Sequence, residues 1–116
     1  MTINFYHNPR CVTSRKALEL LRRKGIEPNI IEYLKTPPSR AQLKKIAELI
    51  GIHPRDMLRK REKAELKKAG IDPGTASAAA AIDAMAAVPV LIERPIIVNG
   101  RKARLGRPPE KVLEAV

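Results

Sequence analysis

Apolar positions in the first third of the chain change from the period of a strand to the period of a helix and back. Residues 2–6 form a short apolar run that predicts a strand. Apolar residues then recur at helical spacing from about Val12 until Gly25 ends the helix. Residues 28–33 predict a second strand. A β-α-β unit with so short a crossover implies a parallel pair of strands joined with right-handed topology.

The middle of the chain has helical spacing throughout. Ser39 can cap a helix whose apolar face ends at Gly51. A short turn or helix is predicted over 53–59, and another helix over 62–69. The alanine-rich segment 76–87 is also predicted as a helix, because alanine has the highest helix propensity.

The last third returns to strands. Residues 95–98 and 101–105 predict two strands of a hairpin, joined by the two-residue turn 99–100. The second of these strands is very basic, which is typical of an edge strand. Proline at the start of 108–110 suits the first turn of a last helix.

This order of elements predicts an α/β fold with a thioredoxin- or glutaredoxin-like mixed sheet. The helical segment, roughly 39–87, is then an insertion between the second and third strands. Because 116 residues are long enough to bury a core, we expect 1–116 to form a single domain. A single cysteine forbids an internal disulfide. The chain starts without a secretory leader and has no long apolar run, so we expect a reducing, cytoplasmic location and no membrane association.

The charge and composition of the chain limit the classes of ligand and partner that it is expected to bind. The formal net charge of +11 suits an anionic substrate or partner as well as a nucleic acid. Only Phe5, Tyr6 and Tyr33 are aromatic, so platforms for base stacking are scarce and a nucleic-acid partner is not expected. Two histidines and one cysteine without clustering predict no metal site.

Cys11 is the residue that points to chemistry. It lies where the first strand turns into the first helix, and a helix N-terminus presents unpaired N–H groups that stabilise a thiolate. A thiol with an ordinary pKa of ~8.5 is only ~3% ionised at pH 7, so this stabilisation decides reactivity. His7, Arg10 and Arg15 are close in sequence, and a positive charge on any of them lowers the same pKa. The alternative is a small buried hydrophobe.

Four segments, taken together and in order, resemble the glutaredoxin-coupled arsenate reductases over essentially the whole chain. They are Tyr6-His7-Asn8-Pro9-Arg10-Cys11-Val12-Thr13-Ser14-Arg15, Tyr33-Leu34-Lys35-Thr36-Pro37-Pro38, Leu58-Arg59-Lys60, and residues 91–98 with 105–108. The resemblance implies a thioredoxin-like enzyme that reduces arsenate to arsenite. It also favours a cis peptide bond before Pro95.

The resemblance implies a role for each site residue. Cys11 is the nucleophile and His7 lowers its pKa, while three arginines bind the oxyanion: Arg59, Arg94 and Arg107. Supporting roles fall to Thr13, Ser14, Arg15 and Pro95. Guanidinium groups suit this task, because their planar forks match an oxyanion that a thiolate alone repels. Without the resemblance, Arg59 reads as a surface cation and His7 as a turn residue.

The electron donors follow from the single cysteine. After Cys11 attacks arsenic, no second thiol of this chain can complete a reduction, so glutathione as co-substrate and then glutaredoxin must supply the electrons. No tightly bound cofactor is expected.

Two residues depart from the family pattern. Val12 occupies a position where the family commonly has glycine, and Lys16 occupies one where asparagine often follows Ser14-Arg15. The branched side chain of Val12 is expected to narrow the approach of an anion to the helix start.

Three other functions are alternatives to this one. A non-enzymatic Spx-type regulator that binds RNA polymerase shares the fold. Such proteins typically carry a redox Cys-x-x-Cys, and Ser14 at the second cysteine position argues against a switch of that kind. A phosphatase-like Cys-x₅-Arg loop is absent, because Ala17 occupies the arginine position. A glutathione-dependent oxidoreductase of another substrate stays open, since arginines and a thiolate suit many oxyanions.

Overall fold

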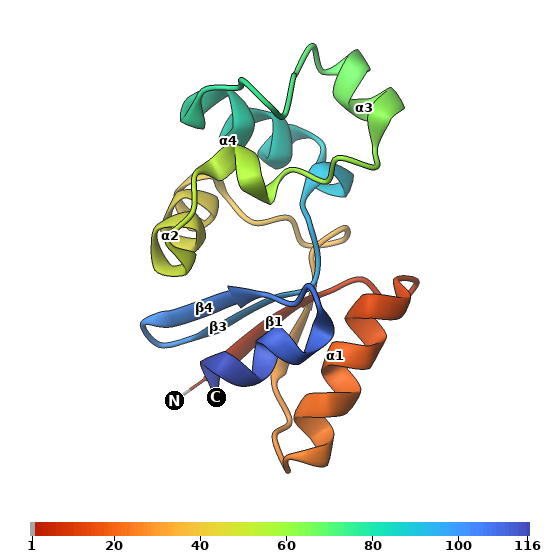
Figure 1. Ribbon diagram of the computed structural model, residues 1–116, viewed down its shortest axis with the longest axis vertical. Helices are drawn as coiled ribbons and strands as arrows, with labels where there is room; N and C mark the ends of the chain where they lie inside the picture. Colours follow the sequence, from red (N-terminus) through yellow and green to blue (C-terminus); the bar gives the residue numbers. More distant parts are fainter. Residues whose placement is uncertain (1) are drawn as a thin grey trace. The chain divides into compact units, whose positions relative to one another are not determined.

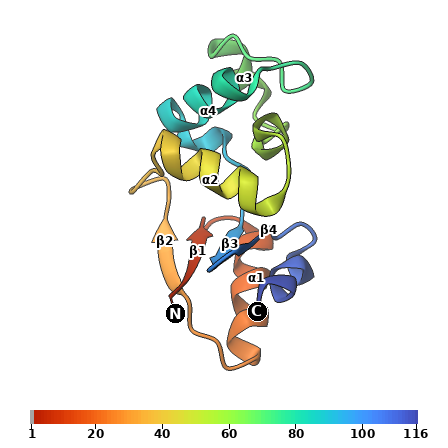
Figure 2. The same cartoon turned by 90° about the vertical axis from the view of Figure 1, so that its left-hand side faces the viewer.

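The computed structural model describes residues 2–116, which divide into two compact units (Figures 1 and 2). The sheet unit contains the chain up to Thr36 together with Arg94–Val116. The helical unit is Pro37–Glu93. The helical unit is inserted between the second and third strands, as the sequence predicts, and its bounds extend beyond the predicted 39–87 at both ends.

The sheet unit is built on a four-stranded mixed sheet. Its strands are β1 (Ile3–His7), β2 (Asn29–Glu32), β3 (Ile96–Asn99) and β4 (Lys102–Leu105). Their spatial order is β2-β1-β3-β4, with β1 and β2 parallel and the other two pairs antiparallel. The basic strand β4 is at an edge, as predicted, and the carboxyl end of β1 lies beside the start of β3.

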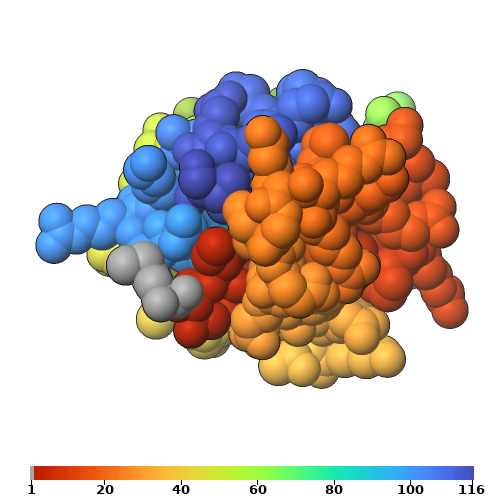
Figure 3. All heavy atoms as spheres, turned by 90° about the horizontal axis from the view of Figure 1, so that it is seen from below, coloured from red at the N-terminus to blue at the C-terminus, as the bar shows by residue number. Residues whose placement is uncertain are grey.

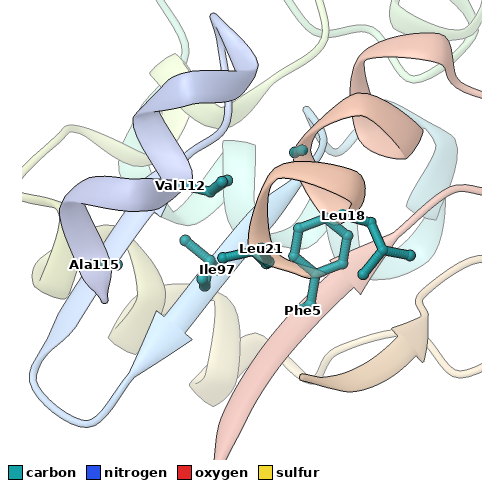
Figure 4. Close-up of a cluster of buried hydrophobic side chains, with 7 residues drawn as sticks. Phe5, Leu18, Leu21, Ile97, Val112 and Ala115 are labelled. Atoms are coloured by element: carbon teal, nitrogen blue, oxygen red, sulfur yellow. The ribbon is translucent and has the colours of Figure 1, made fainter. Parts of the chain in front are cut away.

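Helix α1 (Val12–Arg23) and the 3₁₀ helix η3 (Pro109–Ala115) bury one face of this sheet. Phe5 of β1 pairs with Ile97 of β3 in the ladder, and both belong to a cluster of buried side chains that Figure 4 shows. The cluster consists of Phe5, Ala17, Leu18, Leu21, Ile97, Val112 and Ala115. In Figure 3 the dark blue C-terminal segment lies beside the orange end of α1. This packing fixes the start of α1 relative to the strand ends.

The hairpin turn is displaced by one residue from its predicted place. Asn99 pairs with Lys102 in the ladder, so the two-residue loop is Gly100–Arg101 rather than 99–100. Gly100 has φ of +61°, which glycine adopts without steric cost and which is typical of the first loop position in a type II′ turn. The Asn99 side chain donates instead to the carbonyl of Ala115 at 2.7 Å, so it ties the hairpin to the C-terminal segment.

The helical unit contains α2 (Arg40–Ile50), α3 (Lys63–Lys68) and α4 (Ala78–Ala87). Two 3₁₀ helices, η1 (Pro54–Met57) and η2 (Pro89–Leu91), complete it. Helix α4 packs on α2, η1 and η2. Ser39 caps α2 as predicted, since its Oγ accepts the N–H of Gln42 at 3.1 Å.

Capping also explains where α4 begins. The Ser77 hydroxyl accepts the N–H of Ala80 at 3.1 Å, so the helix begins at Ala78 rather than at the predicted residue 76. The last element also differs from its prediction, because η3 has 3₁₀ rather than α-helical geometry. None of the helices formed by residues 2–116 is long and apolar enough to span a lipid bilayer.

Candidate active site

The turn between β1 and α1 places Cys11 at the start of a helix, as the sequence predicts. Cys11 is the N-cap residue of α1, with extended backbone, and its carbonyl accepts the N–H of Arg15 at 3.0 Å. Its side chain makes no capping hydrogen bond and is partly exposed. The sulfur is therefore accessible beside the unpaired N–H groups of the first helical turn.

Asn8 holds this turn together through three hydrogen bonds. Its carbonyl accepts the N–H of Cys11 at 3.0 Å, and its Oδ1 accepts the N–H of Arg10 at 3.0 Å. Its own N–H donates to the Oγ of Ser14 at 3.1 Å. Asn8 is buried and was not among the predicted site residues. Asparagine often binds the backbone two residues later, and that preference is the signal that would have found it.

His7 and Ser14 form a buried pair behind the turn. The Nδ1 of His7 lies 2.7 Å from the Oγ of Ser14. Burial lowers the pKa of His7 below its ordinary value; the charge of Glu32 opposes this effect, and those of Arg22 and Arg15 add to it. His7 is therefore neutral at pH 7, a state in which Nδ1 can accept the Ser14 hydroxyl proton.

The Cys11 sulfur lies against a guanidinium group. The Nη2 of Arg107 donates to Sγ at 3.7 Å, while the Nε of the same side chain donates to the carbonyl of Arg94 at 2.8 Å. Burial raises the pKa of the thiol, but the backbone N–H groups of Ser14 and Thr13 and the charges of Arg107 and Arg94 outweigh burial. The pKa of Cys11 therefore lies below its ordinary value.

The N–H groups at the helix start lower the Cys11 pKa as expected, but the charged side chains that lower it differ from those we expected. The sequence suggested that a positive charge on His7, Arg10 or Arg15 lowers the Cys11 pKa. His7 is instead neutral at pH 7, and its ring nitrogen is engaged with Ser14. Arg10 and Arg15 are exposed, so water screens their charges. A catalytic role of His7 stays a prediction.

The peptide bonds that follow Arg94 and Arg107 are both cis. The Arg94–Pro95 bond is cis, as the resemblance led us to expect, and the Arg107–Pro108 bond is also cis. The N–H of Gly106 donates to the carbonyl of Pro95 at 2.8 Å. A Cβ atom at Gly106 would lie 2.6 Å from Pro95 Cγ, closer than real Cβ contacts come. Glycine at this position therefore lets the two arginine-bearing loops meet.

Arg59 belongs to the helical unit, whereas the other predicted site residues belong to the sheet unit. Its Nη1 lies 3.0 Å from an oxygen of Glu93, and its Nε lies 3.4 Å from an oxygen of Glu62. Its backbone N–H donates to the carbonyl of Leu91 at 2.7 Å. Neither carboxylate was among the predicted site residues. Binding of an oxyanion by Arg59 stays a prediction.

Val12, the departure from the family pattern, is the first residue of α1 and is 54% exposed. It therefore contributes little to packing, and its effect on an anion stays a prediction. Within residues 2–116 no group of three or more histidine, cysteine or acidic side chains could hold a metal ion.

Comparison with known proteins identifies the family. The model of the ArsC family matches residues 6–115. The chain belongs to the ArsC family. This ArsC-family chain is 45% identical to the arsenate reductase of Escherichia coli K12 over 97% of its own length and 79% of that protein. It is also 44% identical to an arsenate reductase of Haemophilus influenzae, with 98% of each chain covered.

A solved structure agrees with the fold of this ArsC-family protein. The arsenate reductase from Vibrio cholerae superposes with a TM-score of 0.88 at 44% identity, covering 100% of this chain and 98% of that one. The predicted fold class, a thioredoxin-like mixed sheet with a helical insertion, is thereby confirmed.

Proposed function

We propose that this protein is an arsenate reductase in which Cys11 is the nucleophile. The observation that carries the proposal is the contact between Sγ of Cys11 and the guanidinium of Arg107, which is itself anchored on the Arg94 carbonyl. A thiolate and fixed cations at one point are what a reaction between a thiol and an oxyanion needs. The arsenate reductases that resemble this chain over most of its length support the same conclusion.

Charge balance explains why the site needs cations. Arsenate near neutral pH is a dianion, and a thiolate repels it. Arg107 and Arg94 act on the Cys11 thiolate already, and the N–H groups of Thr13 and Ser14 add the positive end of a helix. These groups offset the repulsion while sulfur and arsenic approach. Arg59 is proposed as a third oxyanion-binding arginine.

The reaction balances with two thiols. The Cys11 thiolate attacks arsenic and displaces an oxygen, which leaves as water after protonation. Glutathione thiolate then attacks Sγ of Cys11, so an S–S bond forms and the S–As bond breaks with its electron pair remaining on arsenic. Arsenic is reduced by two electrons to arsenite, and Cys11 and glutathione are oxidised to a mixed disulfide.

The mixed disulfide must then be resolved from outside, since Cys11 is the only cysteine. A glutaredoxin thiol that attacks the glutathione sulfur releases Cys11 as a thiolate and restores the enzyme. No bound cofactor is needed for this cycle. It requires a reducing thiol pool, and we therefore assign the protein to the cytoplasm.

Turnover with arsenate, glutathione and glutaredoxin tests the proposal. Glutathione disulfide formation, followed through glutathione reductase and NADPH, should depend on arsenate and be abolished in Cys11→Ser. Phosphate and a low-molecular-weight disulfide serve as alternative substrates. Arsenate-independent turnover, or turnover with the disulfide alone, would show that the protein is an oxidoreductase of another substrate.

A further inference from the structure

A hollow of about 190 Å³ lies in the sheet unit beside the turn that carries Cys11. We call it the β1–β2 hollow, because its walls are the residues that follow these two parallel strands. His7, Asn8, Pro9 and Arg10 line one wall, and the other is formed by Glu32, Leu34 and Lys35. Arg107 does not line it, so the hollow is distinct from the arginines that flank the sulfur.

The lining combines an apolar surface with three charges. Pro9 and Leu34 supply apolar contact, and Leu34 is 45% exposed. Arg10 and Lys35 supply two cations. Glu32 supplies one carboxylate, which lies 3.7 Å from the ammonium of Lys35.

We propose that the β1–β2 hollow binds glutathione when it reduces the arsenic adduct of Cys11; this inference rests on the proposed function. Glutathione carries two carboxylates and one ammonium group, and the hollow offers two cations and one carboxylate. Arg10 and Lys35 bind the two carboxylates, and Glu32 receives the ammonium group. Leu34 and Pro9 contact the methylene groups of the tripeptide.

The position of the hollow along the chain suits the chemistry. Arg10 precedes Cys11 directly, and consecutive Cα atoms are about 3.8 Å apart, whereas an extended tripeptide spans roughly 10 Å. In the proposed complex, glutathione held on Arg10 extends its thiol towards Sγ. The thiol approaches from the hollow while arsenate occupies the Arg107 side, so the two reactants need not compete for the same cations.

Steady-state kinetics of variants with neutralised lining residues test the inference. In Arg10→Gln/Lys35→Gln we expect KM for glutathione to rise about 5-fold, since each exposed charge pair contributes modestly. Glu32→Gln should raise it less. The rate with 2-mercaptoethanol, which has neither carboxylate nor ammonium group, should stay unchanged. The control Arg23→Gln/Lys24→Gln removes two exposed cations at the far end of α1 and should leave KM for glutathione unchanged.

Binding of S-methylglutathione separates this inference from the proposed function, because it requires neither a thiol nor arsenate. Calorimetry should show binding to the wild-type protein that is weakened about 5-fold in Arg10→Gln/Lys35→Gln. Such binding without arsenate turnover would overturn the proposed function and leave the hollow assigned. Arsenate turnover with unaltered S-methylglutathione affinity in the variant would overturn the hollow alone. A rise only in KM for glutaredoxin would also overturn it, because the surface would then receive the protein donor.

Discussion

At the scale of single residues, the pKa of Cys11 is lowered by the backbone N–H groups of Ser14 and Thr13 and by the charges of Arg107 and Arg94. Replacing Arg107 with alanine removes a charge that holds the thiol pKa down, so the pKa should rise. The rate of iodoacetamide alkylation against pH should have a midpoint below ~8.5 in the wild type and a higher one in Arg107→Ala. The matched control Lys24→Ala should leave the midpoint unchanged. An unperturbed midpoint in the wild type would contradict a thiolate nucleophile.

His7 makes a separate prediction about stability. Burial holds its pKa in the folded state below the unfolded value of ~6.5. The unfolded state therefore binds the proton more tightly, so the stability contributed by neutral His7 is complete above pH ~6.5 and falls as pH decreases through the folded pKa.

Urea unfolding at a series of pH values tests this sign. The free energy of unfolding of the wild type should decline more steeply below pH ~6.5 than that of His7→Gln, which keeps a hydrogen-bonding side chain without a titrating ring. His53→Gln is the matched control, because His53 is the other histidine of the chain. Parallel pH profiles for wild type and His7→Gln would show that the ring takes up its proton as readily in the folded state.

Val12 gives a further prediction at the scale of single residues. It is exposed at the first position of α1, so a valine there is not required by the core. Val12→Gly frees the backbone beside the nucleophile, and we expect arsenate turnover to rise or its KM to fall. Glycine near a helix start should cost up to about 1 kcal/mol of stability. Unchanged kinetics with lower stability would limit Val12 to a structural role, and slower turnover would favour a site shaped for another substrate.

The sequence alone predicted the position of Cys11 at a helix start, but not the hydrogen bonds around it. The position of Cys11 followed from where a strand pattern gives way to a helix pattern. The three hydrogen bonds of Asn8 were not predicted, because an asparagine in a turn is consistent with many local geometries. The charge state of His7 could not be predicted from the sequence either, because it depends on burial by residues that are distant in sequence.

At the scale of elements, the loops before β3 and after β4 must meet closely for Arg107 to reach the sulfur. In Gly106→Ala the new Cβ would lie 2.6 Å from Pro95 Cγ and 2.9 Å from Val112 Cγ1, so the ring of Pro95 or the backbone must move. Overpacking of this kind typically costs 1–3 kcal/mol, about the range we expect here. The movement also displaces the Arg94 carbonyl from Arg107, so the Cys11 pKa should rise and kcat/KM should fall roughly 10-fold.

Gly74→Ala is the control for that variant. Its Cβ would meet only an oxygen of Asp72 at 3.3 Å, and Gly74 lies in the helical unit. Thermal unfolding and alkylation kinetics should therefore be close to those of the wild type. If Gly106→Ala were as stable and as reactive as Gly74→Ala, the close contact between the loops would not determine the site.

Elements were predicted well where local signals are strong, as in the capping of α2 by Ser39. The observed elements differ from the predicted ones where a contact with a residue distant in sequence determines their bounds or geometry. The hairpin turn lies one residue later than predicted because Asn99 binds the C-terminal segment. The last helix packs on α1 and β4 and has 3₁₀ rather than α-helical geometry. The meeting of Arg94, Arg107 and Cys11 likewise depends on the antiparallel register of β1 with β3, which periodicity alone does not specify.

At the scale of the whole molecule, the net charge of +11 offers a competing explanation for anion handling. A general positive field raises the rate of encounter with anions and falls with salt, whereas fixed guanidinium groups act on the transition state. If the field dominates, every exposed cation should matter to a similar extent. If a site dominates, only its own arginines should matter.

Alanine substitutions distinguish these explanations and test the predicted role of Arg59 in oxyanion binding. We expect Arg59→Ala, Arg94→Ala and Arg107→Ala each to lose roughly 2–4 kcal/mol of transition-state stabilisation, measured as kcat/KM for arsenate at several salt concentrations. Lysine should substitute poorly, because it lacks the fork. Arg22→Ala and Lys24→Ala should be nearly silent, and Arg22 already pairs with Glu27.

The double variant Arg59→Ala/Arg107→Ala gives the sharper result, because residues that hold one oxyanion lose less together than the sum of their separate losses. Such non-additivity would assign an arginine of the helical unit and one of the sheet unit to the same step. Strict additivity would mean that Arg59, already paired with Glu62 and Glu93, serves the stability of the helical unit instead. In that case Arg59→Ala should lower the unfolding temperature while kcat/KM for the remaining folded protein stays close to that of the wild type.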